Sequence, residues 1–171
     1  MGEAEQSETG RQDHEFLTEH GISSYGELES KLNAVSARRD TAHAEIKRIE
    51  SRSAELALVM KHAGTYRQIK PLYDRYRKSN DKEKFLRGHE SEIILFEATA
   101  RELKRLGTVP LPTTESMKTE LANLNAEKER LLAEYKAART EAQEYETVKQ
   151  NVDALLTVPK EQEQQRRHEL E

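Results

Sequence analysis

Cationic and aromatic side chains alternate near the middle of the chain, and these residue types are the ones best suited to chemistry. Residues 61–88 contain nine Lys and Arg but only three acidic residues, a net charge of +6. The whole chain carries −4, so the remainder sums to −10. Tyr66, Tyr73, Tyr76 and Phe85 are interleaved with the cations. Cations neutralise phosphates and aromatic faces stack on exposed bases, so this pattern favours nucleic acid, single strands above all.

Ten residues of this stretch are therefore candidates for contacting nucleic acid: Arg67, Lys70, Arg75, Arg77, Lys78, Lys82, Lys84, Arg87, Tyr73 and Tyr76. The alternative interpretation is structural. Tyr66, Ile69, Tyr73 and Tyr76 have the spacing of an apolar helical stripe, with the cations left in water. Both interpretations can hold together, because a buried stripe leaves the cations free to bind.

Residues for catalysis or metal binding do not occur in a usable pattern. The seven glycines are never closer than five residues apart, so no glycine-rich phosphate loop exists, and no Gly-x-Ser-x-Gly occurs. No histidine has a second histidine within five residues, and there is no cysteine. We therefore expect no enzyme activity, metal, cofactor or small-molecule substrate.

The composition indicates how these residues are positioned. Hydrophobic and charged residues each make up 35% of the chain, and Ala, Glu, Lys, Leu and Arg account for 90 of 171 residues. This is typical of coiled coils and long helices. No apolar run approaches the ~20 residues that span a bilayer, so we expect a cytoplasmic protein without membrane contact.

Two long heptad patterns flank the basic stretch. Ser24 and Glu27 have capping-box spacing and predict a helix start. The seam that follows steps alternately by three and four residues: Tyr25, Leu28, Leu32, Val35, Arg39, Ala42, Ile46, Ile49, Ser53, Leu56, Met60 and Ala63. The last helix, capped by Thr113 or Thr114, has a second seam: Met117, Leu121, Leu124, Lys128, Leu131, Tyr135, Ala138, Ala142, Tyr145, Val148, Val152 and Leu155.

A shorter helical region lies between these patterns. Gly64 and Pro71 are expected to weaken or bend the first helix, and residues 79–81 to form a turn and N-cap. A third helix follows and ends at Gly107, with one apolar face: Leu86, His89, Ile93, Phe96, Ala100, Leu103 and Leu106. Ile94 and Leu95 widen this face, which predicts packing on more than one neighbour.

The fold class predicted is all-α, a long antiparallel coiled-coil hairpin with arms 24–63 and 113–156 and a small helical head, 65–107. Joining Tyr25 to Leu156 places Ser53 opposite Lys128 and Ile46 against Tyr135. A parallel dimer through one arm is the alternative. Residues 1–21 are expected to be disordered, apart from a short helix over 14–20 closed by Gly21, and 158–171 to form a frayed polar tail.

The sequence TYRQIKPLYDRYRKSNDKEKFLRGHESEIILFEATARELKRLG, over 65–107, resembles the C-terminal helical region of MobA-type relaxases, the mobilisation nucleases of bacterial conjugative elements. The resemblance extends more weakly over 21–156. It implies a preceding nuclease domain that nicks the transfer origin through a tyrosine and a histidine-rich metal site. These 171 residues contain no counterpart of that metal site, so no tyrosine here is assigned as the nucleophile.

The resemblance and the basic stretch together suggest a non-catalytic module of a conjugative relaxase that contacts transfer-origin DNA. The alternative is a coiled-coil scaffold that self-associates or docks the nuclease to proteins of the conjugation machinery. Steep salt dependence of DNA binding would favour the first hypothesis, and a stable oligomer or protein partner the second.

Overall fold

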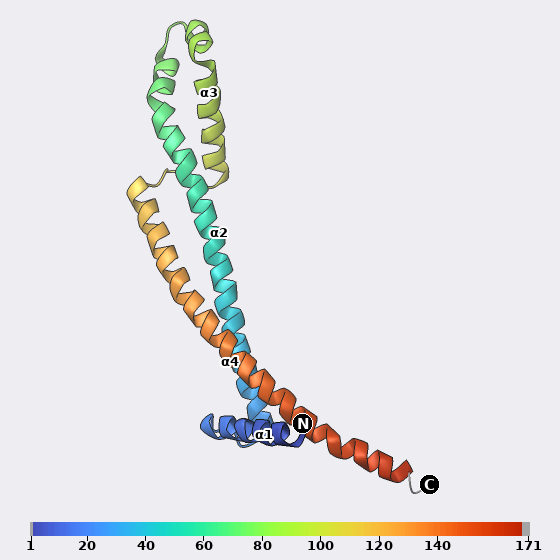
Figure 1. Ribbon diagram of the computed structural model, residues 1–171. Helices are drawn as coiled ribbons and strands as arrows, with labels where there is room; N and C mark the ends of the chain where they lie inside the picture. The colour runs from blue at the N-terminus through green and yellow to red at the C-terminus, as the bar shows by residue number, and fades with distance from the viewer. Residues whose placement is uncertain (1, 169–171) are drawn as a thin grey trace. The chain divides into compact units, whose positions relative to one another are not determined.

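The computed structural model describes the backbone of residues 2–168 and the side chains of residue 5 and residues 8–157. Four helices make up this part of the chain: α1 (Gly2–Glu19), α2 (Tyr25–Lys78), α3 (Lys82–Arg105) and α4 (Thr114–His168) (Figure 1). No strand occurs within residues 2–168. The chain divides into two compact units, one formed by residues 1–45 and 131–171, the other by residues 46–130. The long helices α2 and α4 contribute to both units.

The first unit is built on one apolar cluster between the start of α2 and the later part of α4. Its buried members are Leu28, Val35, Ala142, Tyr145 and Val148. Helix α1 packs on this cluster. The Phe16 ring meets the Tyr145 ring edge-on, with centroids 5.1 Å apart. The Asn151 amide donates to both oxygens of Asp13, at 3.2 and 3.0 Å.

Helix α1 corrects the expectation of disorder before residue 14, since the helix runs from Gly2. Docking of its last turns supplies the reason, because once a helix is nucleated each further residue adds at little cost. The expected end at Gly21 is confirmed. Gly21 has φ 63°, and the Ile22 and Gly21 amides donate to the carbonyls of Leu17 and Thr18. This is a Schellman motif, which needs a left-handed residue at that point.

In this unit α2 and α4 run antiparallel. The Tyr25 hydroxyl donates to Asp153 at 2.5 Å, Arg38 pairs with Glu141, and the His43 and Tyr135 rings lie 5.6 Å apart. Residue numbers rise along α2 as they fall along α4. The polar pairs at the edge of the seam therefore fix direction as well as register.

The second unit joins the later part of α2 to α3 and to the first part of α4. Leu56, Val59, Ala63, Leu103 and Met117 form its buried cluster. Helix α3 lies beside the C-terminal part of α2 (Figure 1).

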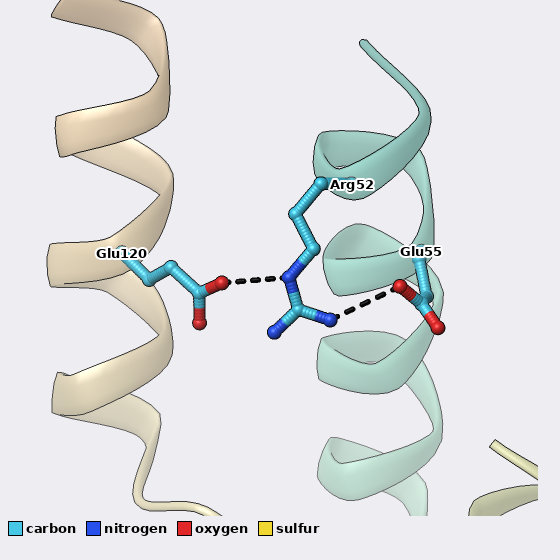
Figure 2. A network of polar contacts seen from close by, with 3 residues as sticks. All are labelled: Arg52, Glu55 and Glu120. Atoms are coloured by element: carbon cyan, nitrogen blue, oxygen red, sulfur yellow. Dashed lines mark hydrogen bonds and ion pairs between the residues drawn. The ribbon is translucent and has the colours of Figure 1, made fainter. Parts of the chain in front are cut away.

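Arg52 of α2 also forms a link to α4 in this unit. Its Nε donates to Glu120 at 2.7 Å and its Nη1 to Glu55 at 3.0 Å, so Arg52 connects the two helices (Figure 2). These two carboxylates raise the pKa of the Arg52 guanidinium, Glu120 having the larger effect.

Burial of the expected seams is confirmed over almost their whole length. Every seam position from Tyr25 to Ala63 is buried or half-buried, and so is every one from Met117 to Val152. Leu155 is the exception, at 67% exposed. The expectation that Ile94 and Leu95 widen the buried face of α3 is wrong, because they are 55% and 49% exposed.

Two of the contacts across the seam differ by one helical turn from the pairings expected. Lys128 pairs with Glu50 at 3.0 Å rather than facing Ser53, and Tyr135 lies on His43 rather than Ile46. Shifting a heptad seam by one turn still places apolar residues against apolar residues. Specific polar pairs decide between such registers, and the sequence pattern alone does not reveal which pairs form.

Helix α2 continues through Pro71 to Lys78, so the expected weakening after Ala63 does not break it. Pro71 removes one backbone hydrogen bond, to the carbonyl of Arg67. The aromatic contacts that Tyr66 and Tyr73 make on either side hold the helix in place. Similarly, α4 extends past Pro159 to His168, where a frayed tail was expected. Residues 169–171 of that tail lie outside the described residues.

The predicted N-caps are confirmed. Ser24 Oγ accepts from the Glu27 amide at 3.2 Å, Asp81 accepts from the Lys84 amide at 3.0 Å, and Thr113 accepts from the Ser116 amide at 3.1 Å. The Glu27 carboxylate accepts from the backbone and the hydroxyl of Ser23, which lowers its pKa. None of the helices within residues 2–168 is long and apolar enough to cross a membrane.

Ile46→Asp should destabilise the protein by about 3 kcal/mol, because the side chain is only 5% exposed and a carboxylate there would lack a partner. Urea unfolding followed by circular dichroism measures the effect. Ala44→Asp, at an exposed position two residues earlier, is the matched control and should cost far less. Equal destabilisation by the two substitutions would contradict the assignment of Ile46 to the buried seam.

Asp153→Asn should lower the melting temperature in a pH-dependent way. The Tyr25 hydroxyl and the Lys149 ammonium hydrogen-bond to Asp153 and lower its carboxyl pKa. A depressed pKa stabilises the fold above the unfolded pKa, and the contribution is lost as pH falls through the folded pKa. The difference in melting temperature between wild type and variant should therefore be largest near about pH 7 and shrink towards about pH 3. Glu144→Gln, at an exposed carboxylate, should show no such trend.

Candidate nucleic-acid interface

The basic stretch folds as the end of α2, a three-residue turn and the start of α3. The Ser79 amide donates to the Tyr76 carbonyl at 3.2 Å, and the Ser79 hydroxyl accepts from the Asp81 amide at 3.3 Å. Asp81 then caps α3. The turn is therefore held by short-range bonds, and it reverses the chain between two cationic helix ends.

A ladder of aromatic rings joins α2 to α3 below this turn. Phe96 of α3 stacks on Tyr66 and on Tyr73, with centroids 4.7 and 4.2 Å apart. The ladder continues from Tyr73 to Tyr76 and from Tyr76 to Phe85, at 5.8 and 6.0 Å. Its last step is Phe85 on His89, at 4.8 Å.

The candidate tyrosines therefore act first as packing residues. Tyr73 and Tyr76 are half-buried, and each touches two other rings of the ladder. Base stacking needs an open aromatic face, and Phe96 already stacks on one face of Tyr73. This arrangement supports the apolar-stripe interpretation for the tyrosines.

Three of the candidate cations are engaged within the protein. Arg67 donates to Thr114 Oγ1 at 2.7 Å and to the Pro112 carbonyl, which ties α2 to the start of α4. Lys70 pairs with Asp74 at 2.8 Å; their hydrogen bond raises the pKa of Lys70 and lowers that of Asp74.

The remaining engaged cation is Arg87. Its Nη2 lies 4.0 Å from a Glu83 oxygen, with both side chains largely exposed. That pair is too open to solvent to hold the guanidinium firmly.

Five candidate cations make no ion pair with any described residue, and we call them the tip cations: Arg75, Arg77, Lys78, Lys82 and Lys84. All five are exposed. Unlike these, the cations Arg38, Arg52 and Lys128 at the contacts between α2 and α4 are paired with carboxylates. The tip is therefore a place where positive charge is concentrated and left unpaired.

The C-terminal end of α2 and the N-terminal end of α3 differ in their effect on the charge at the tip. Arg75, Arg77 and Lys78 lie in the last turn of α2, where the helix dipole is negative and favours cations. Asp81 caps the first turn of α3 and so satisfies an amide that an anion would otherwise bind. The cations rather than the helix N-terminus are thus the groups available to a phosphate.

One hollow lies beside the turn that joins α2 to α3. A shallow hollow of about 300 Å³ beside the turn is lined by Ser79, Asp81, Lys84, Phe85, Gly88 and His89. Within the described residues no group of three or more His, Asp or Glu side chains could hold a metal ion.

Two members of the ladder were not expected at this site. Phe96 was placed on the apolar face of α3, but its role as the ring between Tyr66 and Tyr73 depends on how α3 packs on α2. His89 has a non-helical backbone (φ −140°, ψ 25°) that kinks α3. Its ring Nδ1 lies within hydrogen-bond distance of the Glu92 carboxylate, at 2.9 Å, and its ring contacts that of Phe85. The neighbouring Gly88 was the available sequence signal for a kink.

Comparisons of the chain with protein-family models, with curated proteins and with solved structures gave no match.

Phe96→Ala should destabilise the protein by about 3–5 kcal/mol, because it removes a buried ring on which two tyrosines stack. Glu97→Ala, at the exposed neighbouring position, is the control and should change little. Denaturant unfolding quantifies both. Tyrosine fluorescence should also change in Phe96→Ala, and an unaltered spectrum with wild-type stability would contradict the ladder.

Proposed function

We propose that this chain is a non-catalytic DNA-contacting module whose tip cations bind the phosphate backbone. The observation that carries the proposal is their combination of exposure with the absence of any ion pair to described residues. Solvated cations close together release condensed counterions when they meet a polyanion, which favours binding. Outside residues 61–88 the chain sums to −10, so the tip is the part suited to approach DNA.

The ladder bears on the kind of DNA bound. Because Tyr73 stacks on Phe96 and Tyr76 lies between the rings of Tyr73 and Phe85, we infer that binding rests on charge rather than on base stacking. Duplex DNA has a higher linear charge density than a single strand. The proposed partner is therefore duplex DNA, recognised through its backbone without strong sequence preference.

The relaxase resemblance of residues 65–107 adds a context to this proposal, in which the DNA belongs to a transfer origin. We also propose that α2 and α4 form one coiled-coil hairpin, with α3 in its head; the antiparallel pairs found within each unit support this. A protein scaffold for the conjugation machinery is the competing function. It requires no DNA binding.

Fluorescence anisotropy with a labelled duplex and the matching single strand, at several salt concentrations, tests the proposal. We expect the duplex to bind more tightly and log Kd to change linearly with log salt, with a slope of about 4–5 if all five tip cations contact phosphates. Arg75→Glu/Arg77→Glu/Lys78→Glu should weaken duplex binding at least about tenfold and reduce the slope by about 3.

The matched control is Lys31→Glu/Lys136→Glu/Arg139→Glu, which changes the net charge equally at exposed positions of the other compact unit. It should retain most of the affinity. Equal losses in both triple variants would mean that binding follows net charge alone and would overturn a site at the tip. No binding of wild-type protein at low salt would exclude the DNA function and leave the scaffold.

A further inference from the structure

Helix α3 carries an apolar strip on the face that points away from its core contacts. Its buried residues Ile93, Phe96 and Leu103 occupy one face. Ile94 and Leu95 are turned away from that face and remain 55% and 49% exposed. Large aliphatic side chains side by side on an otherwise charged surface are a feature of contact surfaces.

The residues around this pair extend the strip along the helix. Ser91 lies one turn before Ile94 and Leu95, and Ala98 one turn after, so small side chains flank the large ones. The strip lies beyond the kink at His89, in the regular part of α3. A second helix can therefore approach closely along its whole length.

Charges of opposite sign mark the two ends of the strip. Glu90 lies at its N-terminal end and Arg101 at its C-terminal end, and both are exposed. Neither makes an ion pair with any described residue. Since α3 turns through about 100° per residue, Glu90 and Arg101 lie on the same side of the strip.

We propose that this strip binds the same strip of a second copy of the chain, with the two α3 helices antiparallel about a two-fold axis near Ile94 and Leu95. This arrangement places Ile94 and Leu95 of one copy against the same two residues of the other. It also brings each Glu90 to the level of the partner's Arg101, twice by symmetry. A self-complementary patch of this kind forms an isologous interface.

The charges select both the partner and the direction of the helices. A parallel pairing in register would place Glu90 against Glu90 and Arg101 against Arg101, which is repulsive. The antiparallel pairing turns both contacts into attractions, whereas Glu97, exposed on the same side between them, lies near its own copy in either pairing and favours neither. The surface therefore carries what a second copy of itself requires, and this inference does not depend on whether the tip binds DNA.

The size of the strip sets the affinity expected for the dimer. A contact of about three helical turns falls below the ~800 Å² per partner of a stable complex. The dimer should accordingly form reversibly, at concentrations of tens to hundreds of micromolar.

Sedimentation velocity of the full chain over about 5–500 µM tests the proposal. Ile94→Glu/Leu95→Glu should raise the dimer Kd more than about tenfold, since it buries charge in the contact. Leu155→Glu, at a similarly exposed leucine outside the strip, should leave Kd unchanged. Circular dichroism and melting curves show whether each variant retains its fold.

A charge exchange tests the antiparallel arrangement. Glu90→Arg and Arg101→Glu should each weaken the dimer, and the double variant should restore it, because the pairs re-form with reversed sign. A protein that stays monomeric to 500 µM would overturn the proposal, as would a dimer indifferent to the Ile94/Leu95 variant. Weakening without rescue in the double variant would overturn the antiparallel pairing.

Discussion

A shortage of apolar residues is the constraint on which the rest of this structure depends. Only 35% of the chain is hydrophobic, so each helix can bury one narrow stripe and little more. Such a stripe needs a partner of the same kind along its length, and α2 finds it in α4 and α3. Each unit consequently has its own small apolar cluster, around Leu28 and Tyr145 in one and around Leu56 and Met117 in the other.

A repetitive heptad seam is compatible with several registers of α2 against α4, and polar side chains select one of them. Tyr25 with Asp153, Arg38 with Glu141 and Arg52 with Glu120 each join one position of α2 to one position of α4. Each exposed pair adds little to stability, because water screens it and two long side chains lose freedom. Their effect is on specificity: a shift by one turn would separate every pair at once.

At the tip, an aromatic stack between α2 and α3 supports exposed cations that form no ion pair with described residues. Tyr66, Phe96 and Tyr73 form a stack between α2 and α3 and compensate for the backbone bond lost at Pro71. The ladder thereby engages the half-buried tyrosines in packing and leaves the tip cations in water. Packing and binding use different side chains, so substitutions can separate the two roles.

By itself the sequence determined most of the buried seam positions, the N-caps and the glycines that end α1 and α3. The heptad spacing, Ser24, Asp81, Thr113 and the two glycines that close α1 and α3 act over a few residues, and such local effects can be predicted from a pattern. Tertiary structure alone decided the register, the continuity of α2 past Pro71 and the pairing of Tyr73 with Phe96, because these depend on contacts between residues far apart in the chain. Tertiary structure likewise decided which cations are engaged within the protein. Arg67 and Arg75 both belong to the basic stretch of α2, but only Arg67 donates to the Thr114 hydroxyl and the Pro112 carbonyl.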